Sequence, residues 1–305
     1  MDFGKLSNIK NVNFNLPPDA PETARILRGL PPREGLMKVY IGCTGWSMKE
    51  WVGWVYPKGT KAQDYLHHYS RQFNTIELNT THYRTPSVSD IEKWYQSTPA
   101  DFRFAPKMLQ TVSHSNNLGF GTGLTTQFTE AIQGLEEKLG MCFMQMPPHF
   151  KYNTIGILET YLKKFPKFIP LAIELRHEDW FSNPHHHDAI FKLLETHGIS
   201  TVITDVAGRR DVLHQRLTTG IAVIRFVGND LHPTDYSRID EWVMRLKKWS
   251  EAGLHEVYFF THEPDNLKAP ELALYLFEKI QEHFNTITRG PHFIEDIGSS
   301  QISLF

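Results

Sequence analysis

Polar and charged side chains stand at the ends of several short apolar runs in this sequence. The endings are Glu77, Asn79, Lys107, Gln145, Glu174, Arg176, Asp205, Arg225 and His262. Carboxylate and imidazole groups can exchange protons with a substrate, and guanidinium and ammonium groups bind phosphate or carboxylate. If the runs end close to one another, these residue types indicate acid–base chemistry on an anionic compound.

Two pairs of these residues have the spacing that shares one face of a strand. Side chains alternate between the faces of a β-strand, so residues two apart lie on the same side. Glu77 should therefore lie beside Asn79, and Glu174 beside Arg176. We predict catalytic roles for three residues. Glu77 or Glu174 would act as general base, and His262 as general acid or hydrogen-bond donor.

The other candidates are interpreted as substrate-binding residues. They are Asn79, Tyr83, Lys107, Arg176, His177, Asp205 and Arg225. Guanidinium groups bind phosphate or carboxylate through two parallel hydrogen bonds, which suits Arg176 and Arg225 to an anionic group. The turn at residues 228–230 could add backbone amides to the same site. A second interpretation stays open, in which these charges pair with one another and only hold the structure together.

The sequence contains residue types that can bind a metal ion, but they are not spaced as in a short metal-binding motif. Asp205, His177, His262 and the two glutamates are ligand types, but no His-Glu-x-x-His segment occurs. A divalent metal stays open and is not favoured, so no metal ligands are assigned. No cofactor motif is recognised, and the cofactor is unknown. Cys43 has no base close to it in the sequence and is interpreted as a packed thiol.

Eight short apolar runs must position these side chains, and most are followed by a helix-like stretch. The runs span residues 39–43, 75–79, 102–106, 141–145, 171–175, 201–205, 221–226 and 256–260. Strands that alternate with helices predict a parallel sheet in the α/β class, and eight such units predict a single (β/α)8 TIM-like barrel. Active sites in such barrels lie where the strands end, which is where the polar endings fall.

The predicted barrel spans residues 37–284, between an N-terminal extension (1–36) and a C-terminal tail (285–305). Five prolines prevent a continuous helix in the extension, because proline lacks an amide donor and fixes φ. We interpret the extension as an arm along the outside or bottom of the barrel, with a disordered arm as the alternative. The tail is interpreted as a surface strap.

Local signals place some of the helix boundaries. Ser89 and Glu92 have the spacing of a capping box at a helix start. Pro184 suits a first helical turn, and the short segment 209–216 can form only a short helix. These signals predict where the connections between strands begin.

Composition limits the class of protein. The 305 residues include 40% hydrophobic and 22% charged residues, with a net charge of −2 and a pI near 6.8. These values are typical of a globular protein and argue against a strongly basic nucleic-acid binder. The two cysteines do not form a disulfide framework, and neither a signal peptide nor a membrane span is recognised. We expect a cytoplasmic protein that does not bind membranes. The sequence does not determine its oligomeric state.

Several segments together resemble a known family. They are residues 41–47, 73–79 with Thr81 and Tyr83, 102–107 with Ser113 and His114, 145–148, 172–177 with Trp180 and Phe181, 224–228, and 301–305. In combination they resemble the YecE-like family, the domain of unknown function 72. The resemblance covers about residues 38–284 and the extreme C-terminus, and it leaves out the first 36 residues. It implies a TIM-barrel fold and brings no established activity, substrate or catalytic residue.

The favoured functional hypothesis is an enzyme that binds an anionic, phosphorylated small molecule at the C-terminal rim of the barrel. A hydrolase or a lyase or isomerase would fit, but the reaction class stays open. The first alternative is a barrel that binds or processes nucleic acid. The second is a non-catalytic binding protein, because a fold alone does not establish catalysis.

Overall fold

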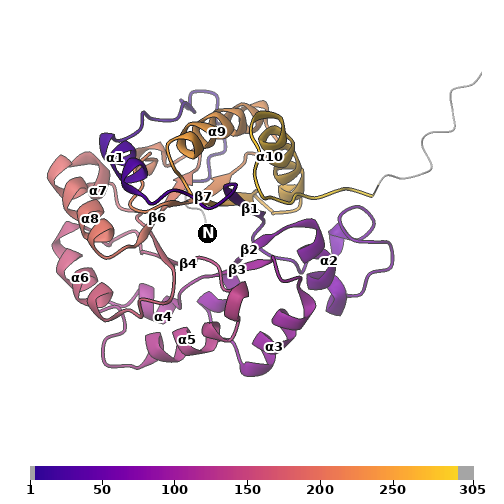
Figure 1. Cartoon of the computed structure of the whole chain (residues 1–305), viewed down its shortest axis with the longest axis horizontal. Helices are drawn as coiled ribbons and strands as arrows, with labels where there is room; N and C mark the ends of the chain where they lie inside the picture. The colour runs from indigo at the N-terminus through magenta and orange to yellow at the C-terminus, as the bar shows by residue number, and fades with distance from the viewer. Residues whose placement is uncertain (1–3, 295–305) are drawn as a thin grey trace, which may run out of the picture.

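The computed structural model describes residues 4–294 and has an α/β architecture in which helices lie around the strands (Figure 1). The strands are β1 (Lys38–Gly42), β2 (Thr75–Leu78), β3 (Arg103–Pro106), β4 (Cys142–Gln145), β5 (Leu171–Glu174), β6 (Ser200–Asp205), β7 (Ile221–Val227) and β8 (Glu256–His262). The α-helices are α1 (Pro21–Gly29), α2 (Tyr65–Gln72), α3 (Val88–Ser97), α4 (Gln110–Ser113), α5 (Leu124–Gln133), α6 (Ile155–Lys164), α7 (Asp179–Ser182), α8 (Pro184–Thr196), α9 (Pro233–Glu251) and α10 (Ala269–His283). Short 3-10 helices are η1 (Lys49–Trp51), η2 (Ala62–Asp64), η3 (Asn79–His82), η4 (Glu136–Lys138), η5 (Tyr152–Thr154) and η6 (Arg210–Val212).

The strands pair in parallel in two sheets. The larger sheet has the order β1-β8-β7-β6-β5-β4, and the smaller sheet pairs β2 with β3. Gln145 is aligned with Glu174 across β4 and β5, and Thr204 with Arg225 across β6 and β7. Because parallel strands end at the same edge of a sheet, these polar residues stand at one level. The register therefore brings together side chains that are far apart in the sequence.

Backbone hydrogen bonds connect the smaller sheet to the larger one on both sides. Next to β3, the amide of Met108 donates to the carbonyl of Phe143 on β4 at 2.8 Å. On the other side, the amide of Glu77 in β2 donates to the carbonyl of Cys43, just after β1, at 3.0 Å. The two sheets therefore meet at two junctions, β3 to β4 and β1 to β2.

A side chain adds two hydrogen bonds to the backbone contact at the junction of β1 and β2. Oδ1 of Asn74 accepts from the amide of Ile41 at 2.7 Å, and its Nδ2 donates to the carbonyl of Val39 at 2.8 Å. The strands approach so closely that a Cβ on Gly42 would lie 2.2 Å from the carbonyl oxygen of Thr75. Only glycine fits this position, because any side chain would collide with backbone.

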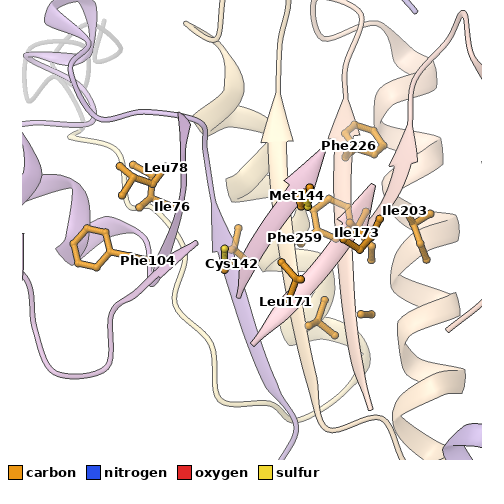
Figure 2. Close-up of a cluster of buried hydrophobic side chains, with 14 of the residues drawn as sticks. Ile76, Leu78, Phe104, Cys142, Met144, Leu171, Ile173, Ile203, Phe226 and Phe259 are labelled. Carbon is orange, nitrogen blue, oxygen red and sulfur yellow. The ribbon is translucent and has the colours of Figure 1, made fainter. Parts of the chain in front are cut away.

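Hydrophobic side chains pack on both faces of the strands. Figure 2 shows part of the cluster between the strands and the helices, with Ile76 and Leu78 from β2, Met144 from β4 and Ile173 from β5. A second cluster lies on the opposite face of the strands. Six of its members precede polar residues by two positions: Ala105 before Lys107, Phe143 before Gln145, Ala172 before Glu174, Val202 before Thr204, Val223 before Arg225 and Phe260 before His262. Strand alternation therefore turns these polar endings to the interior face.

The predicted helix signals were correct at two positions and wrong at one. Pro184 is the first residue of α8, and the segment 209–216 forms only η6, both as predicted. The capping box of α3 uses Ser87 and Asp90 instead of Ser89 and Glu92. Oγ of Ser87 accepts from the amide of Asp90 at 3.2 Å, and the carboxylate of Asp90 accepts from the amide of Ser87 at 2.9 Å. Both Ser87–Asp90 and Ser89–Glu92 have the spacing of a capping box, and the helix begins at the first of these two segments.

The N-terminal extension runs from the carboxyl ends of the strands to their amino ends. The carbonyl of Gly4 accepts from the amide of Gly208, beyond the end of β6, at 2.8 Å. Asp19 accepts from Arg245 on α9 at 2.6 Å, and the carbonyl of Pro31 lies 3.0 Å from an imidazole nitrogen next to the start of β8. Much of this arm follows the outside and bottom, but its first residues reach the opposite end of the strands. The sequence predicts an arm along the outside or bottom and does not predict that it reaches the carboxyl ends of the strands.

Residues 285–294 lie against the amino ends of β1 and β2. Ile287 forms a parallel bridge with Lys38. Arg289 donates to the carbonyl of Phe73, just before β2, at 3.4 Å and pairs with Asp101, just before β3, at 2.8 Å. The rest of the predicted strap, residues 295–305 with the family-like ending 301–305, lies outside the described residues. Across residues 4–294, no helix combines the length and the apolar character needed to cross a membrane.

Candidate functional site

Arg225 joins the two carboxylates that the sequence placed at strand ends. Its Nε and Nη2 donate to the two carboxylate oxygens of Glu77 at 2.8 and 2.9 Å. Its Nη1 donates to Glu174 at 2.9 Å. Bidentate pairs of this kind are strong and geometrically specific. One guanidinium group on β7 therefore holds side chains of β2 and β5 in a fixed arrangement.

Glu77 receives two further polar contacts. Nδ2 of Asn79 donates to Oε1 at 2.9 Å, so this predicted pair does meet on one face. Nε2 of His262 lies 3.0 Å from Oε2, and the imidazole must donate because an ionised carboxylate only accepts. Glu77 is fully buried, and these contacts compensate for the cost of burying its charge.

Glu174 is surrounded by donors in the same way. Nε of Arg176 donates to its Oε1 at 2.9 Å, so the second predicted pair also meets. Oγ1 of Thr204 donates to Oε1 at 3.0 Å, and Nε2 of Gln145 donates to Oε2 at 2.7 Å. The Oε1 atom of Gln145 then accepts from Nζ of Lys107 at 3.0 Å. A continuous chain of hydrogen bonds therefore runs from β3 through β4 to β5.

A cavity of about 640 Å³ opens at this network. Its lining includes six of the residues predicted from sequence: Asn79, Tyr83, Lys107, Arg176, Arg225 and His262. Tyr83 is 72% exposed, whereas the three cationic side chains are nearly buried in the cavity wall. The size and the few convergent polar groups are typical of a site for a small molecule.

Both glutamates remain ionised at neutral pH. Burial alone would raise the pKa of Glu77, but Arg225 and His262 outweigh burial and hold that pKa well below its usual range. The same competition, with Arg176 and Arg225 opposing burial, lowers the pKa of Glu174 to about 2. A carboxylate that is so weakly basic and already accepts several hydrogen bonds is poorly suited to remove a proton. The predicted general-base role therefore does not fit these contacts.

Two other groups that line the cavity have shifted pKa values. Burial lowers the pKa of Lys107 to about 8, and the neighbouring charges of Arg225 and Arg176 act in the same direction. Burial also lowers the pKa of His262, although Glu77 opposes the change. His262 is thus uncharged at pH 7 and can donate a hydrogen bond, while Lys107 can switch between ammonium and amine.

Asp205 does not join the other predicted residues. It accepts from Nη1 of Arg238 at 3.0 Å and from Nε1 of Trp242 at 2.8 Å, both on α9, and it also pairs with Arg210. Thr204, one position earlier on β6, takes the interior place instead. Strand alternation therefore turns Asp205 away from the cavity, and its contacts tie β6 to α9.

His177 and Cys43 also lie outside the cavity lining. Nδ1 of His177 accepts from the amide of Asp179 at 3.0 Å, at the start of α7. Cys43 is fully buried, and burial raises the pKa of its thiol to about 12, which suits the packed thiol expected from sequence. Within the described part of the chain, no three histidine, cysteine or acidic side chains are grouped to hold a metal ion.

Glu263 is a cavity residue that was not predicted from sequence. Its carboxylate accepts from the amides of Asp230 at 2.8 Å and Leu231 at 3.3 Å. Burial raises the pKa of Glu263 to about 7, even though these amides act in the opposite direction. Residues 228–230 were expected to offer amides to a ligand phosphate. The Asp230 amide instead binds a carboxylate of the protein itself, and the Asn229 amide donates to another, that of Asp235, at 2.7 Å.

The N-terminal extension supplies part of the cavity wall, which no local sequence pattern indicated. The wall residues are Gly4, Lys5, Leu6, Ser7 and Ile9. Val206 lies so close to Gly4 that a Cβ there would be 2.8 Å from a methyl group, and Gly4 has a φ of 77°. The combination of close approach and positive φ fits glycine at this point.

Comparison with known proteins places this chain among uncharacterised relatives. UPF0759 protein YecE of Escherichia coli K12 is 29% identical over 271 residues, which cover 83% of this chain and 96% of YecE. UPF0759 protein YunF of Bacillus subtilis 168 is 29% identical over 160 residues, covering 50% of this chain and 55% of YunF. Neither name states an activity.

Two solved structures have a similar fold. A DUF72 family protein from Enterococcus faecalis V583 superposes with a TM-score of 0.67 at 20% identity, covering 84% of this chain and all of that one. A DUF72 family protein from Thermotoga maritima MSB8 has a TM-score of 0.60 at 27% identity, covering 80% of this chain and 98% of that one. The family model described as "Protein of unknown function DUF72" matches residues 40–293, which leaves out the N-terminal extension. This chain therefore belongs to the DUF72 family.

Proposed function

We propose that this protein is an enzyme that binds a small anionic organic molecule, with a phosphate or carboxylate group, in the cavity at the strand ends. The observation that carries the proposal is the excess of cationic side chains in the buried hydrogen-bonded network of the cavity. Lys107, Arg176 and Arg225 line the cavity, and only the carboxylates of Glu77 and Glu174 balance them in the hydrogen-bonded network. Within this network protonated Lys107 leaves one positive charge in excess, in a site where low exposure strengthens electrostatic attraction. The two acidic residues that line the cavity outside the network have partners of their own, Lys268 for Asp230 and backbone amides for Glu263.

The roles of the residues follow from their contacts. Glu77 and Glu174 hold the two guanidinium groups in place, so the ligand meets cations whose orientation is fixed in advance. His262 acts as a neutral hydrogen-bond donor next to Glu77. Lys107 is the group suited to proton transfer, and this replaces the general-base role first assigned to the glutamates.

The proposal includes a closed (β/α)8 barrel as the scaffold. Three observations support closure: the hydrogen bond from Met108 to Phe143, the bond from Glu77 to Cys43, and the two bonds of Asn74 across β1 and β2. A closed barrel would fix the strand ends that carry the network around one common cavity. In barrels of this type the ligand site lies at the carboxyl ends of the strands.

Thermal unfolding with a panel of phosphorylated sugars, phosphorylated three-carbon compounds and 2-oxo acids tests the proposal. At least one anion should raise the melting temperature, because a ligand that binds only the folded state stabilises it. The variants Lys107→Met and Arg176→Met should lose this response, while Arg84→Met, at an exposed ion pair outside the cavity, should keep it. Folded wild-type protein that no anion of the panel stabilises would overturn the proposal.

The two alternatives give different results in the same set of measurements. A nucleic-acid-binding barrel should shift short oligonucleotides in a salt-dependent gel assay, because counterion release dominates such affinity. A non-catalytic binding protein should bind an anion tightly and leave it chemically unchanged after prolonged incubation. Turnover of the bound anion, followed by NMR of the mixture, would support the enzyme.

A further inference from the structure

Lys107 differs from the other cations of the cavity in its partners. Arg225 pairs with Glu77 and Glu174, and Arg176 pairs with Glu174. Within residues 4–294, Nζ of Lys107 has no carboxylate within ion-pair distance, and its hydrogen bond goes to the neutral amide of Gln145 at 3.0 Å. A buried ammonium without a carboxylate partner is unusual, because burying an unpaired charge is costly.

The contact between Lys107 and Gln145 has a defined orientation. The amide nitrogen of Gln145 donates to a carboxylate oxygen of Glu174 at 2.7 Å, and a carboxylate can only accept. The amide oxygen must therefore face Lys107. An amide oxygen can accept from an uncharged amine as well as from an ammonium group, so this partner does not require the lysine to be charged. Gln145 thus positions the Nζ atom without fixing its charge.

Burial is the main factor that favours the neutral form of Lys107, and the charges around it act in both directions. Arg225 from β7 and Arg176 from the end of β5 repel the ammonium, whereas Glu77 and Glu174 stabilise it. Burial and the two guanidinium groups together outweigh the two carboxylates. The net effect lowers the pKa of Lys107 to about 8. At pH 7 the neutral fraction then exceeds that of an exposed lysine by on the order of a hundredfold. A neutral amine has a free lone pair and is a nucleophile.

We propose that Lys107 forms an imine with the carbonyl carbon of a small aldehyde or ketone that carries a phosphate or carboxylate group. The inference rests on the proposed function, because the cationic cavity is what selects the anionic group. It names the reacting part of the ligand and the nucleophile. The position of Lys107 in the cavity wall, which it shares with Arg176 and Arg225, and beside an oriented amide carries the proposal.

The step balances without a cofactor. The lone pair of Nζ forms a bond to the carbonyl carbon, the C=O electron pair moves to oxygen, and protons move from nitrogen to this oxygen. The carbinolamine then loses its hydroxyl group as water, and the C=N bond forms. One amine and one carbonyl compound give one imine and one water, with no change of oxidation state. The neighbouring guanidinium groups attract the phosphate or carboxylate and hold the carbonyl carbon at Nζ.

Borohydride trapping of the full-length protein tests this inference. The protein is incubated separately with glyceraldehyde 3-phosphate, dihydroxyacetone phosphate and pyruvate, and sodium borohydride then delivers hydride to the imine carbon and leaves a stable secondary amine. Peptide mapping by mass spectrometry should find the adduct on Lys107 with at least one probe. The phosphate and carboxylate probes distinguish the two anionic groups, and the yield should rise as pH increases through about 8.

Lys138 is the matched internal control. It is also buried, and burial also lowers its pKa, but its Nζ donates to the carbonyls of Tyr95 and Thr98 outside the cavity. It should remain unlabelled, and Lys107→Met, after its fold is verified by circular dichroism, should lose the specific adduct. Anion binding without an adduct on Lys107 would overturn the imine and leave the proposed function standing. Adducts spread over exposed lysines without excess on Lys107 would overturn it too.

Discussion

At the residue scale, Arg225 holds the charged side chains of the cavity in their arrangement. Its guanidinium group donates to both Glu77 and Glu174, so neither carboxylate is left unpaired in the interior. Buried ion pairs contribute little net stability because desolvation offsets the attraction, and their frequent role is to hold groups in place. We therefore interpret this network as the device that positions the cationic wall. Acid–base chemistry is left to Lys107.

Glu263 gives a prediction for pH dependence. Its pKa in the folded protein is about 7, above the usual value of 4.5, so the folded state binds a proton more readily than the unfolded state does between these values. The free energy of unfolding should therefore fall as pH rises from about 4.5 to 7. Above pH 7 Glu263 is ionised in both states and no longer contributes to the pH dependence. Relative to Glu263→Gln, wild type should lose roughly 2 kcal/mol across this window, allowing for screening by solvent.

Urea unfolding at pH 5 and pH 7.5 measures this difference for wild type and Glu263→Gln. Glu278→Gln is the control, because this glutamate is exposed on α10, and its unfolding should follow wild type at both pH values. Equal pH dependence of wild type and Glu263→Gln would contradict the raised pKa.

At the scale of elements, the N-terminal segment 4–9 forms a wall of the cavity. The DUF72 match begins at residue 40, so this wall lies outside the part of the chain that the family model matches. The arm is fixed further along the chain by other contacts. Asp19 accepts from Arg245 and from the indole of Trp249 on α9, and Phe14 lies against Arg238. Segment 4–9 can therefore affect the ligand without being needed for the fold.

A variant lacking residues 1–9 should keep its fold and change its ligand binding. The anion that stabilises wild type most should bind more weakly, because Lys5 and the other wall residues are lost and the cavity opens to solvent. The melting temperature without ligand should change little, because Phe14 and Asp19 keep their contacts. Titration calorimetry and a melting curve check both parts. Unchanged affinity would show that the segment takes no part in binding.

At the scale of the whole molecule, the β1–β2 junction is one of the two places where the described strands have no regular ladder between them. The two sheets are connected there by the side chain of Asn74, by the backbone hydrogen bond from Glu77 to Cys43 and by close packing at Gly42, in place of a regular backbone ladder. Asn74 is only 5% exposed, so no water can readily replace it. The cavity depends on this junction, because Glu77 on β2 must stay in reach of Arg225 on β7.

Asn74→Ala should destabilise the protein strongly. The substitution leaves the amide of Ile41 and the carbonyl of Val39 buried without their partner, and each unpaired buried group costs about 1–3 kcal/mol. We expect a loss of roughly 2–5 kcal/mol in urea unfolding. Asn13→Ala, an exposed residue in the N-terminal arm, is the control and should change stability little. A small effect of Asn74→Ala would mean that the junction does not limit stability.

The sequence by itself determined the elements and the two polar pairs. Strand and helix periods are local, so all the expected strands occur within a residue or two of their predicted positions. Alternation along one strand is equally local, which is why Glu77 meets Asn79 and Glu174 meets Arg176.

Only the tertiary structure decided which endings converge. β6 is buried on both faces and has polar residues on each, so its pattern could not show that Thr204 faces the interior and Asp205 faces α9. The place of Glu263 depends on amides from the loop after β7, and the cavity wall depends on Gly4 reaching Gly208. Such contacts join residues from separate elements, and strand and helix periods carry no information about them.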